Sequence, residues 1–285
     1  MRFFVAGARS MLASDLIPLL EQKGEVRCGS RPDFDIADLD KVDKNLKAYM
    51  PDIVINCAAY TAVDKAESDK ETAFKTNREG SENLARACRE IGAKLVHIST
   101  DFVFDGENNQ PYTEDDATNP IAIYGVSKLA GEISIKNTTD NYLIVRTSWL
   151  YGKNGNNFVK TILRLASERD KLGIVYDQTG TPTYTKDLAE GIINLIENKA
   201  SGIYHFSNEG VCSWYDFAHE IIGVAEEMGE KFKLKKLRPI LTEDYPTPAK
   251  RPVYSVLDKA KYKETTSQEI PHWRDGLKLY LEEEG

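Results

Sequence analysis

The chain has 285 residues, of which 41% are hydrophobic, enough to bury a sizeable core in one large domain or two modest ones. Its 37 Lys and Arg residues face 45 Asp and Glu, and the formal charge of −8 excludes the basic surface with which proteins bind nucleic acid or anionic membranes. No stretch has the length of a signal-peptide core or the roughly 18 apolar residues of a transmembrane helix. We expect a soluble, cytoplasmic protein that binds any phosphate-bearing ligand at a local positive site.

The cysteines give no sign of a disulfide framework or a metal centre. Cys28, Cys57, Cys88 and Cys212 are scattered along the chain without a CxxC pair. This pattern is typical of reduced thiols in a cytoplasmic protein, so we expect no metal site.

Short β-rich segments alternate with helical patterns through the first half of the chain. Strands are predicted at 2–6, 26–29, 52–59, 94–100 and 142–150, and helices at 13–24, 39–50, 71–92 and 120–137. Gly24 and Gly92 stand where helices would end before a strand. The alternation is typical of βαβ units that build a parallel sheet.

The pattern loosens after about residue 150. Helices are predicted at 156–170, 186–198, 213–229 and from Pro271, strands at 172–177 and 202–208, and a loop at 178–185. No repeat or flexible linker separates the halves. We expect a Rossmann-type, doubly wound parallel sheet in residues 1–150. Residues 151–285 would form a smaller α/β substrate lobe, with some segments returning to the first domain and the ligand cleft between the two.

The turn after the first strand, GARSMLA, keeps one glycine where a dinucleotide-binding loop usually has three. Gly7 fits the first position, which makes the tight exit from the strand, and Ala13 is an accepted residue at the third. Ser10 occupies the second, where its hydroxyl can donate to a phosphate beside the free amides of Met11 and Leu12. A plain strand-turn-helix with Ser10 as the N-cap explains the loop equally well.

Tyr124 and Lys128 in YGVSK stand four residues apart on a predicted helix, so their side chains emerge on one face. An ammonium beside a phenol lowers the pKa of the phenol from about 10, and such a tyrosine can exchange a proton with a carbonyl oxygen. Alone, this spacing is more often a solvated helix face. However, Thr100 and Asp101 end a predicted parallel strand, where open α/β sheets bind ligands, and Thr100 can bond the same carbonyl or phenol.

Motifs along nearly the whole chain resemble those of the extended short-chain dehydrogenase/reductases. They are GARSMLA, INCAAYTAVDKAE, STDFVFDG, YGVSKLAGE, RTSWLYG, NNFVKT, DQTGTPTY and AKRPVYS. Their combination is similar to the branch that reduces the 4-keto group of dTDP-4-dehydro-L-rhamnose to dTDP-L-rhamnose, and is hard to place in the epimerase or dehydratase branches. The resemblance implies a nucleotide-sugar substrate and hydride from NADPH or NADH, and we expect a monomer or a homodimer.

The resemblance also implies roles for individual residues. Tyr124 would be the proton donor, Lys128 its partner and ribose ligand, and Thr100 the residue that tunes the phenol and carbonyl. The implied substrate-binding residues are Thr100, Asp101, Trp149, Asn157 and Arg251. The implied cofactor-binding residues are Gly7, Arg9, Ser10, Met11, Leu12, Ser30, Arg31, Asp35, Ile36, Ala59, Tyr60, Thr61, Ile98, Tyr124 and Lys128. Trp149 can instead be a core aromatic, and Asn157 and Arg251 can be loop or surface residues.

The end of the second strand bears on the choice of cofactor. Ser30 and Arg31 stand where an acidic residue would bind a ribose 2′-hydroxyl and repel a 2′-phosphate, and Arg9 adds a second cation in the first loop. We therefore expect NADPH, with NADH as the alternative.

Departures from the family pattern leave two other functions open. Ser10 and Ala13 replace glycines, and Phe102 stands where the family commonly has Tyr, which removes one hydroxyl that could bind the sugar. One alternative is a reductase or epimerase of another nucleotide-linked sugar. The other is a non-catalytic NADP-binding regulatory subunit like that of methionine adenosyltransferase, which is similar in fold and sequence. The retained Tyr124 and Lys128 favour an enzyme.

Overall fold

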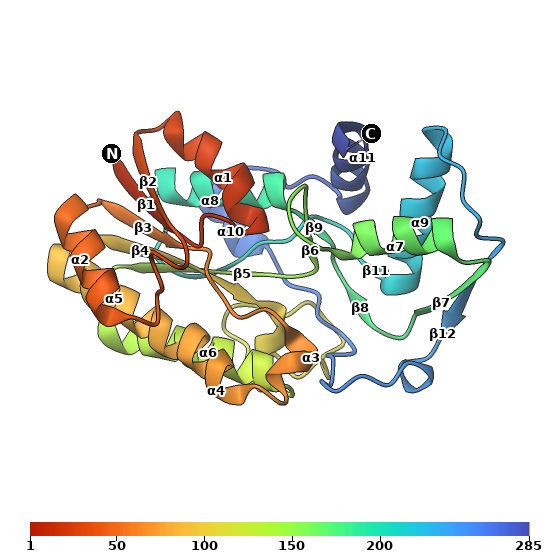
Figure 1. Ribbon diagram of the computed structural model, residues 1–285, viewed down its shortest axis with the longest axis horizontal. Coiled ribbons are helices and arrows are strands. Elements are labelled where there is room, and N and C mark those ends of the chain that lie inside the picture. The colour runs from red at the N-terminus through yellow and green to blue at the C-terminus, as the bar shows by residue number, and fades with distance from the viewer. Residues whose placement is uncertain (285) are drawn as a thin grey trace.

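A six-stranded parallel sheet forms the centre of the computed structural model, which describes residues 1–284 (Figure 1). Its strands are β1 (Arg2–Ala6), β2 (Glu25–Gly29), β3 (Ile53–Asn56), β4 (Lys94–Thr100), β5 (Tyr142–Thr147) and β10 (Gly202–His205). They lie in the order β10-β5-β4-β3-β1-β2, and every neighbouring pair is parallel. The predicted Rossmann-type fold is therefore confirmed.

Helices cover both faces of the sheet (Figure 1). On one face lie α1 (Met11–Glu21), α8 (Thr185–Glu197) and α10 (Ala260–Thr266), and on the other lie α2 (Leu39–Tyr49), α5 (Gly80–Ile91) and α6 (Ile123–Thr138). Successive residues of a strand point to opposite faces of the sheet. In β1, Phe3 and Val5 belong to the core beneath α1 and α8, whereas Phe4 and Ala6 belong to the core beneath α2 and α5. Because both faces of the sheet are buried, the inner strands β1 and β3 are apolar over most of their length rather than alternating, whereas the edge strand β2 exposes Glu25 and Arg27.

Residues from the second half of the chain complete this sheet. The edge strand β10 pairs with β5, with Ile203 opposite Ile144, and α8 packs against α1. The chain therefore returns to the sheet after leaving it at β5.

A smaller lobe lies beside the sheet (Figure 1). It contains α7 (Phe158–Glu168), α9 (Trp214–Glu227), α11 (Trp273–Glu284) and the parallel pair β7 (Lys171–Val175) and β12 (Lys236–Ile240). Two short strand pairs, β6 (Leu150–Tyr151) with β9 (Thr183–Tyr184) and β8 (Thr179–Gly180) with β11 (Cys212–Ser213), belong to the connecting segments. The core of this lobe is aromatic, with Tyr151, Phe217 and Trp273 fully buried.

The helix predicted at 71–92 is interrupted. It consists of α4 (Lys70–Phe74), a π-helical turn η1 (Lys75–Glu79) and α5. Within η1 the buried Asn77 holds the loop after β3, because its Oδ1 accepts from the Tyr60 amide at 2.8 Å and its Nδ2 donates to the Tyr60 carbonyl at 3.1 Å. The extra residue of a π turn leaves no periodicity signal, so the sequence reads as one helix.

Other differences concern element ends and short elements. The first helix begins at Met11 because Ser10 caps it, and the fourth begins only at Ile123. Several short elements were not predicted: α3 (Val63–Ala66), α10, the single turns η2 (Asp101–Val103) and η3 (Thr242–Asp244), and the two-residue strands β8, β9 and β11, of which β8 and β9 lie within the predicted loop 178–185. Strand β12 was missed because Lys236, Arg238 and Pro239 interrupt its apolar pattern at the exposed edge of a two-stranded sheet.

A buried ion pair joins α6 to the sheet. Glu132 accepts from Arg146 through both oxygens, at 3.0 Å from Nε and 2.7 Å from Nη2, and Ser99 donates to the same carboxylate. The two charged side chains are only 2% and 3% exposed. The pair thus fixes α6 against β5 through Arg146 and against β4 through Ser99.

Removing one partner of this pair should destabilise the protein strongly. We expect Glu132→Ala to lower the free energy of unfolding by about 3–5 kcal/mol, because it leaves the Arg146 guanidinium buried without its counter-charge. Denaturant unfolding followed by circular dichroism measures this. The matched control is Glu168→Ala, which breaks the exposed Arg164–Glu168 pair and should cost less than about 1 kcal/mol. Equal effects of the two substitutions would show that the buried pair does not fix α6.

Candidate active site

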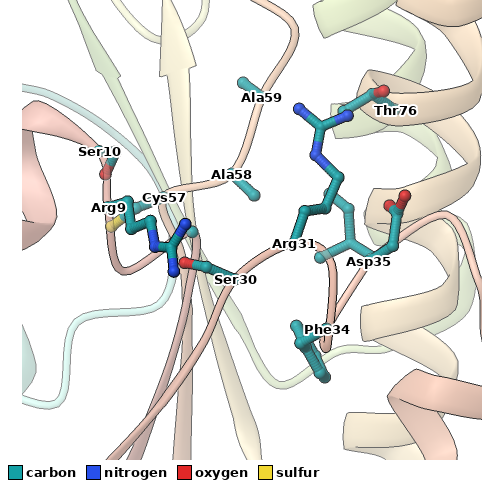
Figure 2. Close-up of a pocket in the computed structure, with 12 residues that line it drawn as sticks. Arg9, Ser10, Ser30, Arg31, Phe34, Asp35, Cys57, Ala58, Ala59 and Thr76 are labelled. Atoms are coloured by element: carbon teal, nitrogen blue, oxygen red, sulfur yellow. The ribbon is translucent and has the colours of Figure 1, made fainter. Parts of the chain in front are cut away.

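The strand order reverses between β1 and β3, and in sheets of this kind ligands bind in the crevice outside the carboxyl ends of the strands at that point. A cavity of about 310 Å³ lies there (Figure 2). It is lined by residues that follow β1, β2 and β3, together with one residue of η1: Gly7, Arg9, Ser10, Ser30, Arg31, Phe34, Asp35, Ile36, Cys57, Ala58, Ala59 and Thr76. Eight of the expected cofactor residues therefore meet in one place.

The first loop of this crevice requires one glycine. Gly7 has a φ of +76°, and a Cβ at this position would lie 2.5 Å from the Ala58 nitrogen. Ser10 is the N-cap of α1, and its Oγ accepts from the Ala13 amide at 3.3 Å. The cap uses a lone pair of the hydroxyl, and its hydrogen, which meets the Cys57 thiol, can turn to a phosphate, so capping and phosphate binding are compatible.

The first turn of α1 supplies further donors. The amides of its first residues, Met11 and Leu12, have no intrahelical acceptor. The Leu12 side chain is buried in the core, so only its backbone can reach a ligand. Ala13 is fully buried beneath the sheet, which explains why this loop needs no third glycine.

The end of the crevice at Ser30 and Arg31, after β2, is basic. Figure 2 shows Ser30 between the exposed side chains of Arg9 and Arg31. The Ser30 Oγ is buried and makes no hydrogen bond to any described residue. Asp35 is engaged elsewhere, because its Oδ1 accepts from the Ala37 amide at 3.0 Å. Two cations and an unpartnered hydroxyl suit an anionic group at this end of the crevice.

Several expected cofactor residues lie outside this cavity: Met11, Leu12, Tyr60, Thr61, Ile98, Tyr124 and Lys128. Tyr60 turns its hydroxyl toward Asp69 Oδ2 at 3.1 Å. Sequence reasoning missed Phe34, Cys57, Ala58 and Thr76. Phe34 and Ala58 adjoin expected residues and Cys57 lies two positions before Ala59, whereas Thr76 lies in the π turn and carried no signal.

Tyr124 lies buried at the start of α6. Burial raises the pKa of its phenol to about 12, opposed by a hydrogen bond with Thr100, while the nearby Asp101 carboxyl adds to the rise. The expectation that Lys128 lowers this pKa is wrong for this structure. Lys128 points into β4, where its Nζ donates to the Ile98 carbonyl at 2.6 Å and lies 3.3 Å from His97 Nε2. The phenol therefore keeps its proton at neutral pH.

Burial also affects the charges of Lys128 and Asp101. The pKa of Lys128 is lowered to about 8, since burial opposes its charge more than Glu132 supports it. Burial raises the pKa of Asp101 to about 6. Asp101 Oδ1 accepts from Thr100 Oγ1 at 2.9 Å, whereas Oδ2 is buried near Ser255 without a well-formed hydrogen bond. This oxygen is available to accept from a ligand hydroxyl.

An aromatic wall stands next to Asp101. A Cβ on Gly180 would lie 2.6 Å from the Trp149 ring and 2.8 Å from Ser255 Oγ, so both side chains line the same spot. Trp149 has a φ of +46° and stacks on Trp214, with ring centroids 3.5 Å apart and planes at 6°. A left-handed conformation at a non-glycine residue costs about 1–3 kcal/mol and persists only where its surroundings hold it. The sequence did not predict a role for Trp214, because its stacking partner Trp149 lies 65 positions away along the chain.

Beyond Trp214 a second cavity of about 600 Å³ opens in the smaller lobe. Phe158, Trp214 and Tyr245 contribute aromatic rings to its lining, and four cationic side chains accompany them: Arg164, Arg169, Lys171 and Arg251. The cavity therefore combines rings that can stack on a flat group with charges that can bind an anion.

Asn157 and Arg251 already have partners. Asn157 caps α7, with Oδ1 accepting from the Lys160 amide at 3.0 Å and Nδ2 donating to the Gly152 carbonyl at 2.7 Å, and it lines neither cavity. The Arg251 guanidinium binds both oxygens of Asp64, at 3.1 and 2.8 Å, and holds the pKa of that carboxyl below its usual range. The pair connects α3 in the first domain to the segment after β12.

Within residues 1–284 no group of three His, Cys, Asp or Glu side chains is arranged to bind a metal ion. The four cysteines are free thiols. No helix in the same range is long and apolar enough to cross a bilayer.

The buried Asp101 carboxyl predicts a pH-dependent stability effect. Its folded pKa of about 6 lies above the ordinary value of 3.8, so its stabilising contribution is present below 3.8 and lost as the pH rises through 6. We expect Asp101→Asn, which cannot ionise, to gain about 2 kcal/mol of unfolding free energy relative to wild type between pH 4 and pH 8. Urea unfolding at both pH values measures the gain. Asp140→Asn, at an exposed position, is the charge-matched control. An equal change of unfolding free energy in both variants would contradict the raised pKa of Asp101.

Comparison with known proteins identifies the family. Residues 1–285 match the family described as RmlD substrate binding domain. The chain is 44% identical over 283 residues to the spore coat polysaccharide biosynthesis protein SpsK of Bacillus subtilis, covering 99% of this chain and 97% of the relative. It is 41% identical over 254 residues to dTDP-4-dehydrorhamnose reductase of Escherichia coli, covering 87% and 85%.

Solved structures agree with this assignment. The dTDP-4-dehydrorhamnose reductase of Clostridium acetobutylicum superposes with a TM-score of 0.94 at 43% identity, and the Bacillus anthracis enzyme in complex with NADP does so with 0.94 at 40%, each covering 99% of both chains. The UDP-glucose 4-epimerase of Thermus thermophilus, at 21% identity and a TM-score of 0.82, shares the fold alone. The chain belongs to the RmlD family, the dTDP-4-dehydrorhamnose reductase branch of the extended short-chain dehydrogenase/reductases.

Proposed function

We propose that this protein reduces the 4-keto group of dTDP-4-dehydro-L-rhamnose to dTDP-L-rhamnose with NADPH. One observation carries the proposal: Tyr124, Thr100 and Asp101 lie buried together at the carboxyl end of β4, and neighbouring residues connect them to a phosphate-suited crevice and to an aromatic, cationic cavity. The link to the crevice is Cys57, which lines it and lies near Lys128. The link to the cavity runs through Ser255, Trp149 and Trp214.

The crevice fits a dinucleotide. The close approach of Gly7 to Ala58 and the unpartnered Ser30 hydroxyl support this, since a Cβ would close the loop and a buried hydroxyl needs a partner. In this proposal Ser10 and the amides of Met11 and Leu12 hold the pyrophosphate, and Arg9, Ser30 and Arg31 hold the 2′-phosphate. Asp35 and Ile36 lie at the adenine. Ala59, Tyr60, Thr61, Ile98 and Lys128 would follow the dinucleotide toward Tyr124. NADPH supplies a hydride to the carbonyl carbon when it is bound.

Tyr124 is the proton donor in this mechanism. Because burial raises the pKa of its phenol, the hydroxyl is protonated at neutral pH and can give its hydrogen to the keto oxygen. The hydrogen bond with Thr100 orients the phenol, and the Thr100 hydroxyl, which donates to Asp101 Oδ1 before the reaction, can turn its hydrogen to the phenolate that remains. Asp101 Oδ2 accepts from a sugar hydroxyl, and the Trp149 ring covers the apolar face of the deoxysugar.

The second cavity would take the nucleoside diphosphate. The rings of Trp214 and Phe158 suit a base, and Arg169 and Lys171 suit the diphosphate. Arg251 contributes only if it shares its charge between Asp64 and the substrate, and Asn157 would act by holding the start of α7. We retain from the sequence the division into a cofactor domain, 1–150, and a mainly substrate-binding lobe, 151–285. A cytoplasmic location and a monomeric or homodimeric state also remain predictions.

Consumption of NADPH with dTDP-4-dehydrorhamnose, made in situ from dTDP-glucose, tests the function directly. We expect turnover with this substrate and little with UDP- or GDP-linked keto sugars. Tyr124→Phe should bind NADPH as wild type does but lose at least about 100-fold in kcat, the scale of a lost general acid. NADPH binding without any turnover of the dTDP sugar would favour the regulatory alternative, and preference for another keto sugar would favour the other reductases.

Removal of one cation should weaken the preference for NADPH. We expect Arg31→Ala to raise the Michaelis constant for NADPH by roughly tenfold and leave that for NADH nearly unchanged, since only NADPH carries the 2′-phosphate. The matched control is Arg27→Ala, an exposed arginine on β2 whose guanidinium lies over the Tyr49 ring instead. A wild-type ratio of the two constants in Arg31→Ala would contradict this assignment.

A further inference from the structure

The segment 242–251, which follows β12, is held at both ends by carboxylates. At its beginning, Asp177 accepts from the Thr242 amide at 2.9 Å and from the Thr242 hydroxyl at 2.8 Å. At its end, Asp64 of α3 accepts from the guanidinium of Arg251 at 3.1 and 2.8 Å. Asp177 follows β7 of the smaller lobe, whereas Asp64 belongs to the first domain. The segment therefore connects the two parts of the molecule.

The same segment forms part of the wall of the second cavity. Tyr245 and Arg251 both line this cavity, and two prolines between them restrict the backbone. Ala249 is buried, and its amide donates to Asp64 at 3.2 Å. The contacts of Asp64 therefore fix the place of Arg251 in the cavity wall.

Asp64 uses only one edge of the Arg251 guanidinium. Its Oδ1 accepts from Nη1 and its Oδ2 from Nη2, so the carboxylate binds the end of the group. The Thr247 hydroxyl and the Ala249 carbonyl also accept from Nη1. Within the described part of the chain, Nε and the second hydrogen of Nη2 meet no acceptor. These two N–H groups form a second edge, which can bind another anion through two parallel hydrogen bonds.

Arg251 differs from the other cations of the cavity. Arg164, Arg169 and Lys171 are exposed, and Arg164 is paired with Glu168. The Arg251 side chain is only 26% exposed and is held from two sides of Nη1 and Nη2. An oriented side chain loses less conformational freedom when it binds a ligand than a free one does. The lining contains no carboxylate, so an anion at the free edge meets no repulsion from the cavity wall itself.

We propose that Asp64 is a positioning residue for substrate binding, which holds one edge of the Arg251 guanidinium and presents the other edge to the diphosphate of the nucleotide sugar. The carboxylate then strengthens binding, although its charge has the same sign as that of the ligand. The inference rests on the proposed function, in which the second cavity takes the nucleoside diphosphate.

Asp64→Asn tests the inference by the direction of its effect on binding. The substitution keeps the shape of the side chain but replaces one oxygen with a donor, so the Arg251 guanidinium should lose its orientation. We expect the Kd of dTDP to rise by roughly tenfold, measured by isothermal titration calorimetry with NADP⁺ saturating the crevice. Asp64→Glu, which can pair with Arg251 again, should recover most of the affinity.

Two outcomes of the titration would overturn the inference. Unchanged or tighter binding of dTDP by Asp64→Asn would show that the carboxylate is neutral toward the diphosphate or competes with it for Arg251. Absence of dTDP binding in wild type would show that the cavity takes no such ligand.

Kinetics separate positioning from a general effect on the fold. Asp64→Asn should raise the KM for the dTDP-linked keto sugar by about tenfold and leave kcat and the KM for NADPH within about twofold, because Arg251 does not line the cofactor crevice. The matched control is Glu71→Gln, which removes the same charge from an exposed position on α4 and should behave as wild type. Equal rises of both Michaelis constants in Asp64→Asn would overturn the specific role of Asp64.

Proteolysis reports on the anchor without any ligand. Trypsin can cut after the exposed Lys250 but not after Arg251, because Pro252 follows it. We expect Asp64→Asn to be cut after Lys250 several-fold faster than wild type, with Glu71→Gln cut at the wild-type rate. A wild-type rate in Asp64→Asn would overturn the anchoring by Asp64. Weaker dTDP binding in Asp64→Asn, together with absence of turnover in wild type, would contradict the proposed function and support the role of Asp64.

Discussion

The seating of α6 on the sheet is the constraint on which the rest of the site depends. This helix carries Tyr124, Lys128 and Glu132 at successive turns, and all three point into the protein. Glu132 is held by Arg146 of β5, and Lys128 donates to the carbonyl of Ile98 on β4. A further buried contact, in which Asn77 Nδ2 donates to Ser127 Oγ at 2.9 Å, holds the same helix turn. Because each contact is polar and directional, the helix cannot rotate or slide without leaving a buried group unpaired.

Burial has one common effect on the chemistry of the site. It raises the pKa of Tyr124 and of Asp101 and lowers that of Lys128, so each group is moved toward its uncharged form. The sequence alone suggested a charged lysine that makes the phenol acidic. The folded protein instead holds a protonated phenol, which suits a reaction in which the tyrosine gives a proton. The apolar surroundings, more than any single neighbour, produce this bias.

The smaller lobe is tied to the site by aromatic stacking and by one ion pair. Trp149, at the end of the chain segment that leaves the sheet, stacks on Trp214 at the start of α9, and Trp214 packs against Phe158 of α7. Arg251 reaches back to Asp64 in the first domain. These contacts place the Trp149 ring, which lies beside Asp101, next to the cationic cavity. In the proposed function one extended ligand spans both.

The sequence by itself determined the alternation of strands and helices, the glycine that opens the first loop, and the common face of Tyr124 and Lys128, because these depend on local propensity and on the fixed period of a helix. Only the tertiary structure decided what those residues meet. The partner of His97 lies 41 positions away and that of Arg251 lies 187 positions away, and neither separation leaves a trace in the pattern of the chain. The sequence also does not predict the π turn that points Asn77 inward, because one added residue does not change the apolar spacing of the helix on either side. The charge states of the site were decided last of all, because they follow from burial, which exists only once the chain has folded.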